Sequence, residues 1–231
     1  MKGIIFYTDS CIQDPIKSAV QKYVQASGLP IVSTSLKPLD FGTNFVMEGK
    51  RGYPMMVNQI VTALENSTSR YVFFCEHDVL YHKSHFDFTP PTDDMFYYNT
   101  NNWRWDYPND RIFKYDGLSS LSQMCCNREL ALNHYKARQR RIAEHPERFE
   151  TREPSQARAW GYEPGTKHTH NGGFSNEESG RWHSEFPNID IRHSGTFSPP
   201  KVTIESFKHP PTGWFETTLD HIEGWHLKEL L

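Results

Sequence analysis

Two carboxylates at the end of an apolar run are the residues of this chain best suited to chemistry. Residues 71–75 are apolar or aromatic, and Glu76, His77 and Asp78 follow them directly. Such a run predicts a buried strand, and open α/β sheets bind ligands at the carboxyl ends of their strands. Glu76 and Asp78 alternate to the same side of an extended chain, so both can face one hard cation. The segment predicts a divalent-metal site, with solvated loop acids as the plain alternative.

Further candidates for ligand contact lie outside this segment. Lys50 and Arg51 stand in a glycine-flanked loop before a predicted helix, where two cations and a flexible backbone can approach phosphates. A solvated loop explains the same residues. His77 is predicted to point away from the acid pair, as a supporting or substrate-facing group.

The elements that must position these residues alternate between strand and helix. The patterns predict strands at residues 2–7, 29–35 and 71–75, and helices at residues 14–26 and 55–64. This β-α-β-α-β order favours a parallel sheet with right-handed crossovers. We therefore expect an α/β fold in which a mixed, mainly parallel sheet is flanked by helices, with a Rossmann-like N-terminal half.

The second half of the chain is less regular. The patterns predict a strand at residues 95–100, an aromatic loop at 101–107, a return to the sheet within 117–127, a helix at 128–143 and a strand at 189–192. Residues 161–180 are rich in Gly, Thr, His, Asn and Ser, which predicts a mobile active-site loop.

Bulk composition narrows the classes of function. The chain has 231 residues, 23% of them charged, and a formal net charge of -3, so no global positive field draws it to nucleic acid or anionic membranes. No apolar window is long enough for a membrane span or a signal peptide. The four cysteines lack metal-ligand spacing and are interpreted as reduced, mostly buried thiols. We expect a cytoplasmic protein with one domain over residues 1–231.

The N-terminal strand, the two β-α units and the strand ending in Glu76-His77-Asp78 together resemble the GT-A class of nucleotide-sugar glycosyltransferases. In that class an Asp-x-Asp motif holds Mn²⁺ or Mg²⁺ against the donor's diphosphate. Glu76 departs from the pattern by one methylene, which makes Asp78 the safer ligand. The resemblance implies a nucleotide-sugar-binding half over residues 1–90, a nucleotide-diphosphate sugar donor with UDP-sugars favoured, and donor contacts from Tyr7, Thr8 and Asp9. Capping of the first helix by Asp9 is the alternative for that residue.

A later histidine extends the resemblance. Residues 182–193 are similar to the histidine-bearing segment of small phage-encoded glycosyltransferases, which would place the protein in a host cytoplasm. A late histidine often supplies another metal ligand in the GT-A class, and His193 is our choice. Imidazole nitrogen beside carboxylate oxygen favours Mn²⁺ over Mg²⁺. Residues 91–231 are then the half that binds the acceptor and closes the metal site.

Inverting transfer to a hydroxyl acceptor requires a carboxylate base. The candidates are Glu185, Asp190, Glu178 and Asp116, and Glu185 is preferred because it shares the segment of His193; a retaining enzyme needs no such base. The acceptor is open: glycans, lipid-linked sugars and a 5-hydroxymethylpyrimidine in DNA all qualify. Aromatic residues at 103–107 and basic residues at 136–141 favour DNA, whereas the net charge opposes it.

Two other classes of function compete with this interpretation. A metallohydrolase would use the cluster of His77, Asp78, His82 and His85, although three-ligand zinc sites usually show a clearer spacing. A non-catalytic carbohydrate-binding module would use the tryptophans, but it leaves the nucleotide-type half unexplained.

Overall fold

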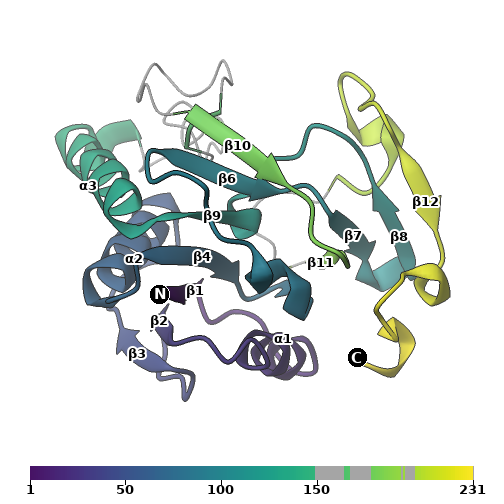
Figure 1. The fold of residues 1–231 in the computed structure, drawn as a ribbon, viewed down its shortest axis with the longest axis horizontal. Helices are drawn as coiled ribbons and strands as arrows, with labels where there is room; N and C mark the ends of the chain where they lie inside the picture. The colour runs from purple at the N-terminus through teal and green to yellow at the C-terminus, as the bar shows by residue number, and fades with distance from the viewer. Residues whose placement is uncertain (149–163, 167–177, 194, 196–200, 231) are drawn as a thin grey trace.

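The computed structural model describes residues 1–148, 164–166, 178–193, 195 and 201–230. Its strands form a seven-stranded and a five-stranded sheet, which lie next to each other in Figure 1. The three helices are α1 (Ile16–Gln25), α2 (Tyr53–Asn66) and α3 (Arg128–Glu144). The strands are β1 (Lys2–Thr8), β2 (Ile31–Ser35), β3 (Thr43–Val46), β4 (Tyr71–Glu76), β5 (Val79–Leu80), β6 (Met95–Asn99), β7 (Asn102–Asp106), β8 (Arg111–Lys114), β9 (Met124–Asn127), β10 (Glu178–Trp182), β11 (Asn188–Arg192) and β12 (Phe215–Thr217).

The large sheet has the order β10-β6-β9-β4-β1-β2-β3, and β9 alone runs antiparallel to its two neighbours. The strands β1, β2, β3 and β4 are parallel. The central strands β1 and β4 are nearly continuously apolar, as expected for strands covered on both faces, whereas the edge strand β3 is partly exposed. In the register of β1 and β4, Tyr7 lies opposite Glu76. The carboxyl ends of these two central strands therefore meet at one point of the sheet edge.

Helices cover both faces of this sheet. The buried residues of α1 recur at helical spacing and pack with Ile4, Phe6 and Phe73 on one face. On the other face α2 and α3 pack with Ile5, Val72 and Phe74. The expected class, a mixed and mainly parallel α/β sheet flanked by helices, is confirmed.

The small sheet has the order β12-β8-β7-β11-β5. It contains the late strands β11 and β12 together with β5, which follows the end of β4. β5 begins directly after Asp78 and pairs antiparallel with β11, so that Asp190 lies opposite Val79. The amide of Ile191 continues this pairing by donating to the carbonyl of Asp78 at 2.8 Å. This register brings Arg192 and His193 alongside the residues that end β4.

The structure corrects several expectations for the second half. Residues 102–106 form the strand β7, in which Trp103 and Trp105 are buried, rather than an aromatic loop. Alternating aromatic and charged side chains fit a strand whose two faces differ. In the predicted mobile loop at 161–180, residues 161–163 and 167–177 lie outside the described residues, and residues 178–180 begin β10. None of the helices in the described part of the chain combines the length and hydropathy that a membrane crossing requires.

Candidate active site at the ends of β1, β4 and β11

Asp78 and His193 come together where β4 ends and β11 ends. Oδ2 of Asp78 lies 3.8 Å from Nε2 of His193, and their side chains are 14% and 13% exposed. Two ligands held about 2.1 Å from one ion lie roughly 3.0–3.5 Å apart, so a small movement brings both onto one cation. The structure thus places the predicted ligand Asp78 beside the predicted late histidine.

Glu76 is held from two sides. The hydroxyl of Tyr7 donates to Oε1 of Glu76 at 2.6 Å, and the amide of Glu76 donates to the hydroxyl of Tyr81 at 2.9 Å. Burial, together with the negative charge of Asp78, raises the pKa of Glu76 to about 8. Tyr7 is itself only 5% exposed, so a buried side chain holds the Glu76 carboxylate through this hydrogen bond.

The electrostatics of this site fit a divalent cation. Burial raises the pKa of Asp78, and the nearby Asp190 adds to the rise while His77 and Arg192 oppose it. Burial also lowers the pKa of His193, against the pull of Asp78, which favours the neutral imidazole that metals bind. Buried carboxylates that resist ionisation are stabilised in their charged form by a bound cation. The carboxylate of Asp78 and the imidazole of His193 are ligand types that suit Mn²⁺.

Asp190, one of the candidate bases, is buried between two arginines. Its Oδ2 forms an ion pair with Arg192 and lies 3.7 Å from Nε of Arg104. Burial opposes the charge of Arg192, but Asp190, Asp78 and Glu76 raise the pKa of its guanidinium. For Arg104, burial dominates and lowers the pKa to about 10. Sequence reasoning missed both arginines, because only the pairing of β7 with β11 sets Arg104 opposite Asp190.

Glu185, the preferred base, lies in a different environment. It is exposed, and the titratable group that its charge acts on is His82, whose pKa is lowered by burial and raised in part by Glu185. The structure therefore places Asp190, rather than Glu185, within electrostatic reach of Asp78 and Glu76.

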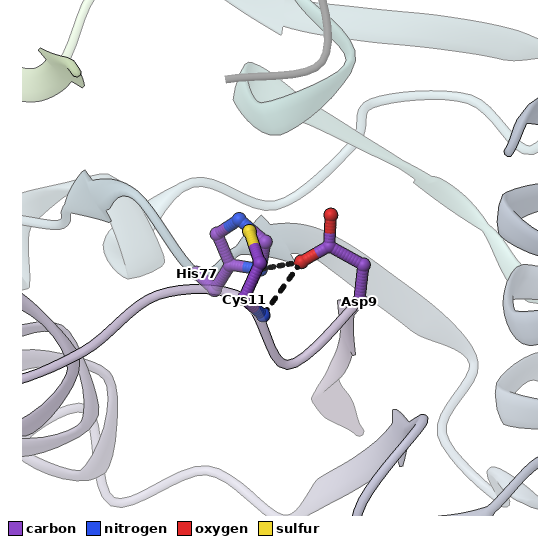
Figure 2. Close-up of side chains that lie close together, drawn as sticks. All are labelled: Asp9, Cys11 and His77. Atoms are coloured by element: carbon purple, nitrogen blue, oxygen red, sulfur yellow. Dashed lines mark hydrogen bonds and ion pairs between the residues drawn. The ribbon is translucent and has the colours of Figure 1, made fainter. Parts of the chain in front are cut away.

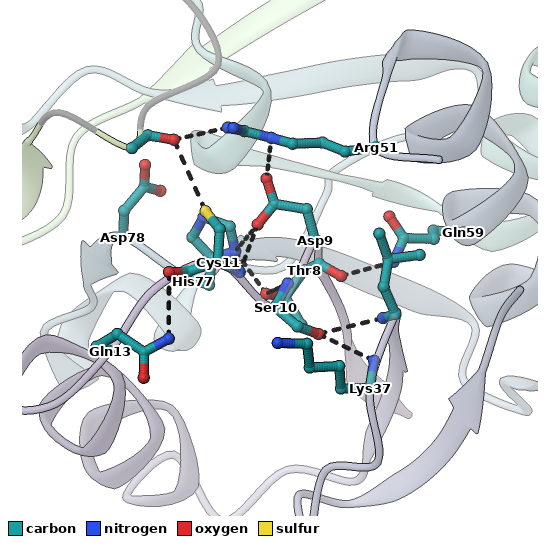
Figure 3. A network of polar contacts seen from close by, with 12 residues as sticks. Thr8, Asp9, Ser10, Cys11, Gln13, Lys37, Arg51, Gln59, His77 and Asp78 are labelled. Carbon is teal, nitrogen blue, oxygen red and sulfur yellow. Dashed lines mark hydrogen bonds and ion pairs between the residues drawn. The ribbon is translucent and has the colours of Figure 1, made fainter. Parts of the chain in front are cut away.

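The turn after β1 contributes polar side chains that contact His77 and Arg51 (Figure 3). Thr8 Oγ1 and His77 Nδ1 are 2.6 Å apart, and His77 Nδ1 lies 3.7 Å from Asp9 Oδ1. The amide of Cys11 donates to the same Asp9 oxygen at 3.0 Å. Burial works against the charge of Asp9, but its contacts with Cys11, His77 and Arg51 lower its pKa overall. The predicted donor-contacting residues Thr8, Asp9 and His77 thus lie together, with Thr8 and His77 joined by a hydrogen bond and Asp9 in electrostatic contact with His77.

Arg51 joins this turn to the segment after β11. Its guanidinium forms an ion pair with Asp9, and its Nη2 donates to the carbonyl of Gly195 at 2.6 Å. The amide of Gly195 in turn donates to Nδ1 of His193 at 3.1 Å. Arg51 is thereby linked to the orientation of His193. Its predicted partner in phosphate binding, Lys50, is exposed.

The histidines of the alternative metallohydrolase site are used elsewhere. Nδ1 of His82 accepts from the amide of Ser84 at 3.2 Å and begins the short helix Lys83–Asp87. His85 is fully buried among aromatic rings, and burial lowers its pKa to about 3. Its Nδ1 lies 3.0 Å from the Nδ2 atom of Asn99. The proposed cluster of His77, Asp78, His82 and His85 is not favoured, because His82 and His85 serve the fold.

Cys11 is a functional candidate that sequence reasoning set aside. Asp9, Cys11 and His77 offer ligand atoms that all lie within 4.8 Å of one another (Figure 2). Burial and the neighbouring Asp9 raise the pKa of the Cys11 thiol to about 11. The Asp-x-Cys spacing after the first strand was the available signal, but its third member comes from a turn far along the chain.

Comparison with known proteins gives distant similarities to enzymes. No protein-family model matches the sequence, and no curated protein matches it. Among solved structures, HddC from Yersinia pseudotuberculosis aligns with 82% of this chain and 93% of its own at 9% identity and a TM-score of 0.43. The bifunctional IspDF from Campylobacter jejuni aligns with 80% of this chain, 50% of its own, at 9% identity and a TM-score of 0.41.

A third similar structure is a mutant Drosophila β1,4-galactosyltransferase 7 in complex with manganese, UDP-Gal and xylobiose. It aligns with 63% of this chain and 62% of its own at 11% identity and a TM-score of 0.35. This chain therefore spans about half of IspDF and less than two thirds of the galactosyltransferase. TM-scores below 0.5 are too low to assign a fold family or an activity.

Proposed function

We propose that the protein is a metal-dependent glycosyltransferase of the GT-A kind, which moves a sugar from a nucleotide-diphosphate donor to a hydroxyl acceptor. The observation that carries this proposal is the approach of His193 Nε2 to Asp78 Oδ2, 3.8 Å apart. The partly buried Glu76 at the end of β4 lies within electrostatic reach of Asp78, which helps to raise its pKa. These groups stand at the carboxyl edge of a mainly parallel sheet, where such folds bind nucleotides. UDP-sugars are the favoured donors.

The residues divide the work of the reaction. Asp78, His193 and Glu76 hold Mn²⁺, or Mg²⁺, which when bound offsets the negative charge that grows on the leaving diphosphate. Tyr7 fixes the carboxylate of Glu76 through its hydroxyl. Asp9 accepts a hydrogen bond from the donor's ribose or base, supported by Thr8 and His77, and Arg51 contributes positive charge at the phosphate end.

The acceptor side is less constrained. We assign the base, for an inverting course, to Asp190 or Glu185, and the electrostatic neighbours of Asp190 support Asp190. A modified base in DNA is not supported by α3, because two of its cations are engaged in contacts within the fold. Arg138 is buried and donates to the hydroxyl of Tyr53 at 3.2 Å, while Lys136 pairs with Glu65 at 2.6 Å. A sugar hydroxyl is the acceptor class that we carry forward.

The test is thermal unfolding with UDP-, GDP- and CDP-sugars, each with and without Mn²⁺. A donor at a hundred times its Kd stabilises the native state by about 2.7 kcal/mol, which raises the Tm by roughly 5–10 °C for a chain of this size. We expect that rise only when donor and Mn²⁺ are both present. In Asp78→Asn the rise should disappear, whereas Asp40→Asn, at an exposed acid outside the site, should keep it. The proposal fails if no nucleotide sugar shifts the Tm in the presence of Mn²⁺ or, in a repeat of the experiment, of Mg²⁺.

A further inference from the structure

The turn after β1 and the turn after β4 bring together three different metal-ligand types (Figure 2). These are the carboxylate of Asp9, the thiol of Cys11 and the imidazole of His77, with all three ligand atoms within 4.8 Å of one another. The side chains of Asp9 and His77 are 15% and 14% exposed, so an ion there would be largely enclosed. The function proposed above does not use Cys11.

We propose that Asp9, Cys11 and His77 form a second metal site, selective for Zn²⁺ and related soft divalent ions, beside the site of Asp78 and His193. Thiolate sulfur and imidazole nitrogen favour zinc, whereas carboxylate-rich sets suit Mg²⁺ and Mn²⁺. Zinc ligands in a tetrahedral site lie roughly 3.3–3.8 Å apart. The three atoms therefore need to approach by only about 1 Å, and a fourth position stays open to water.

The surroundings of the three side chains resemble the outer shell of a metal site. His77 Nδ1 lies 2.6 Å from Oγ1 of Thr8, and if Nδ1 carries the ring proton it donates there, in which case the Nε2 lone pair is the one that would hold the ion. The hydroxyl oxygen of Thr8 also accepts from the amide of Ser10 at 3.0 Å, which fixes its position. The amide of Cys11 orients Asp9 through the hydrogen bond at 3.0 Å. Both contacts are present without an ion, so little ordering is left for binding.

Arg51 is the group that zinc must displace. Its ion pair with Asp9 occupies Oδ2, the carboxylate oxygen that does not receive the Cys11 amide. The Arg51 side chain is 40% exposed, so it can turn into solvent when a divalent ion replaces its charge. On binding, the S–H bond of Cys11 breaks, a bond forms between sulfur and zinc, and the proton passes to solvent.

Cobalt spectroscopy tests this site without reference to catalysis. Co²⁺ replaces Zn²⁺ in such sites, and a thiolate ligand produces a sulfur-to-cobalt charge-transfer band. We expect this band in the metal-free protein on addition of Co²⁺, and its loss on addition of Zn²⁺. The other three cysteines lie buried in β4 and β9, so the band should vanish in Cys11→Ser. Zinc affinity, measured against a chelator, should fall by more than about tenfold in that variant.

Two further variants separate the outcomes. Asp78→Asn removes the ligand of the neighbouring site, and it should keep the cobalt band even if it abolishes donor binding. If Cys11→Ser does not fold, as judged by its thermal unfolding, His77→Gln takes its place and should weaken zinc binding to the same degree. A wild-type protein without a thiolate band at saturating Co²⁺ overturns the proposal, as does a band that disappears in Asp78→Asn.

Discussion

Glu76→Gln is expected to stabilise the metal-free protein. Burial and the negative charge of Asp78 both disfavour the ionised form of the Glu76 carboxyl group, and together they raise its pKa from 4.5 to about 8. A shift of this size corresponds to about 3 kcal/mol of lost stability at pH 7 and about 5 kcal/mol at high pH. Glutamine keeps a side-chain oxygen that can accept from the Tyr7 hydroxyl, but it carries no charge. Because the surroundings relax around a charge, we expect a gain of about 1–3 kcal/mol.

The pH dependence gives this prediction its sign. Between the unfolded pKa of 4.5 and the folded pKa of about 8, folded wild-type protein binds more protons than unfolded protein. The free energy of unfolding therefore falls as the pH rises through this window, by the contribution of Glu76. Glu76→Gln lacks that contribution. The difference between the two proteins should be close to zero near pH 4 and should grow until about pH 8.

The assay is urea unfolding in the presence of a chelator at several pH values between 4 and 9. Glu48→Gln, at an exposed glutamate, is the matched control and should follow the wild type. Adding Mn²⁺ should reverse the order, since an ion beside Asp78 stabilises ionised Glu76 but not glutamine. A Glu76→Gln variant that is no more stable than wild type at pH 8 without metal would refute the reasoning about this buried charge.

Two more substitutions test the scaffold of the site and its surface. Tyr81→Phe removes a fully buried hydroxyl that accepts from the Glu76 amide and donates to the Ser122 carbonyl at 3.0 Å. The free energy of unfolding, measured in urea, should fall by about 1–3 kcal/mol. An unchanged midpoint would show that the hydroxyl contributes nothing. Arg111→Ala breaks a two-pronged ion pair with Glu216, but both side chains are more than a third exposed, and the loss should stay below about 1 kcal/mol and shrink further in high salt.

Local sequence patterns were sufficient for the long strands and helices of the first half of the fold. The apolar strands β1, β2 and β4 and the periodic helices α1 and α2 each bury one continuous set of side chains, so their type follows from residues close in sequence. The strands β3, β8 and β12 were not predicted. Each has only three or four residues, and the described side chains of β3 and β12 are largely exposed, so neither length nor hydrophobic pattern marks them.

The site was predictable where one segment contains its chemistry and unpredictable where distant segments pair. Glu76 and Asp78 could be singled out because they end an apolar strand. The choice of His193 needed a resemblance, since nothing local to residue 193 indicates that β11 pairs with β5. The ion pairs of Arg104 and Arg192 with Asp190 depend on the same sheet, and neighbouring residues contain no information about them. Glu185 was preferred because of its position in the sequence, and in the structure it is exposed, with its charge acting on the pKa of His82.

The pairing of β5 with β11 also fixes when Asp78 and His193 can come together during synthesis of the chain. β5 follows Asp78 at once, but its partner strand ends at Arg192, so the ribosome must translate about half of the chain between them. At ordinary elongation rates this interval lasts on the order of ten seconds. The parallel strands β1, β2 and β4 can assemble during that time, while Asp78 still lacks His193. Nascent chains that stop short of β11 would therefore fold part of the large sheet and yet lack the approach of His193 to Asp78 on which the proposed metal site rests.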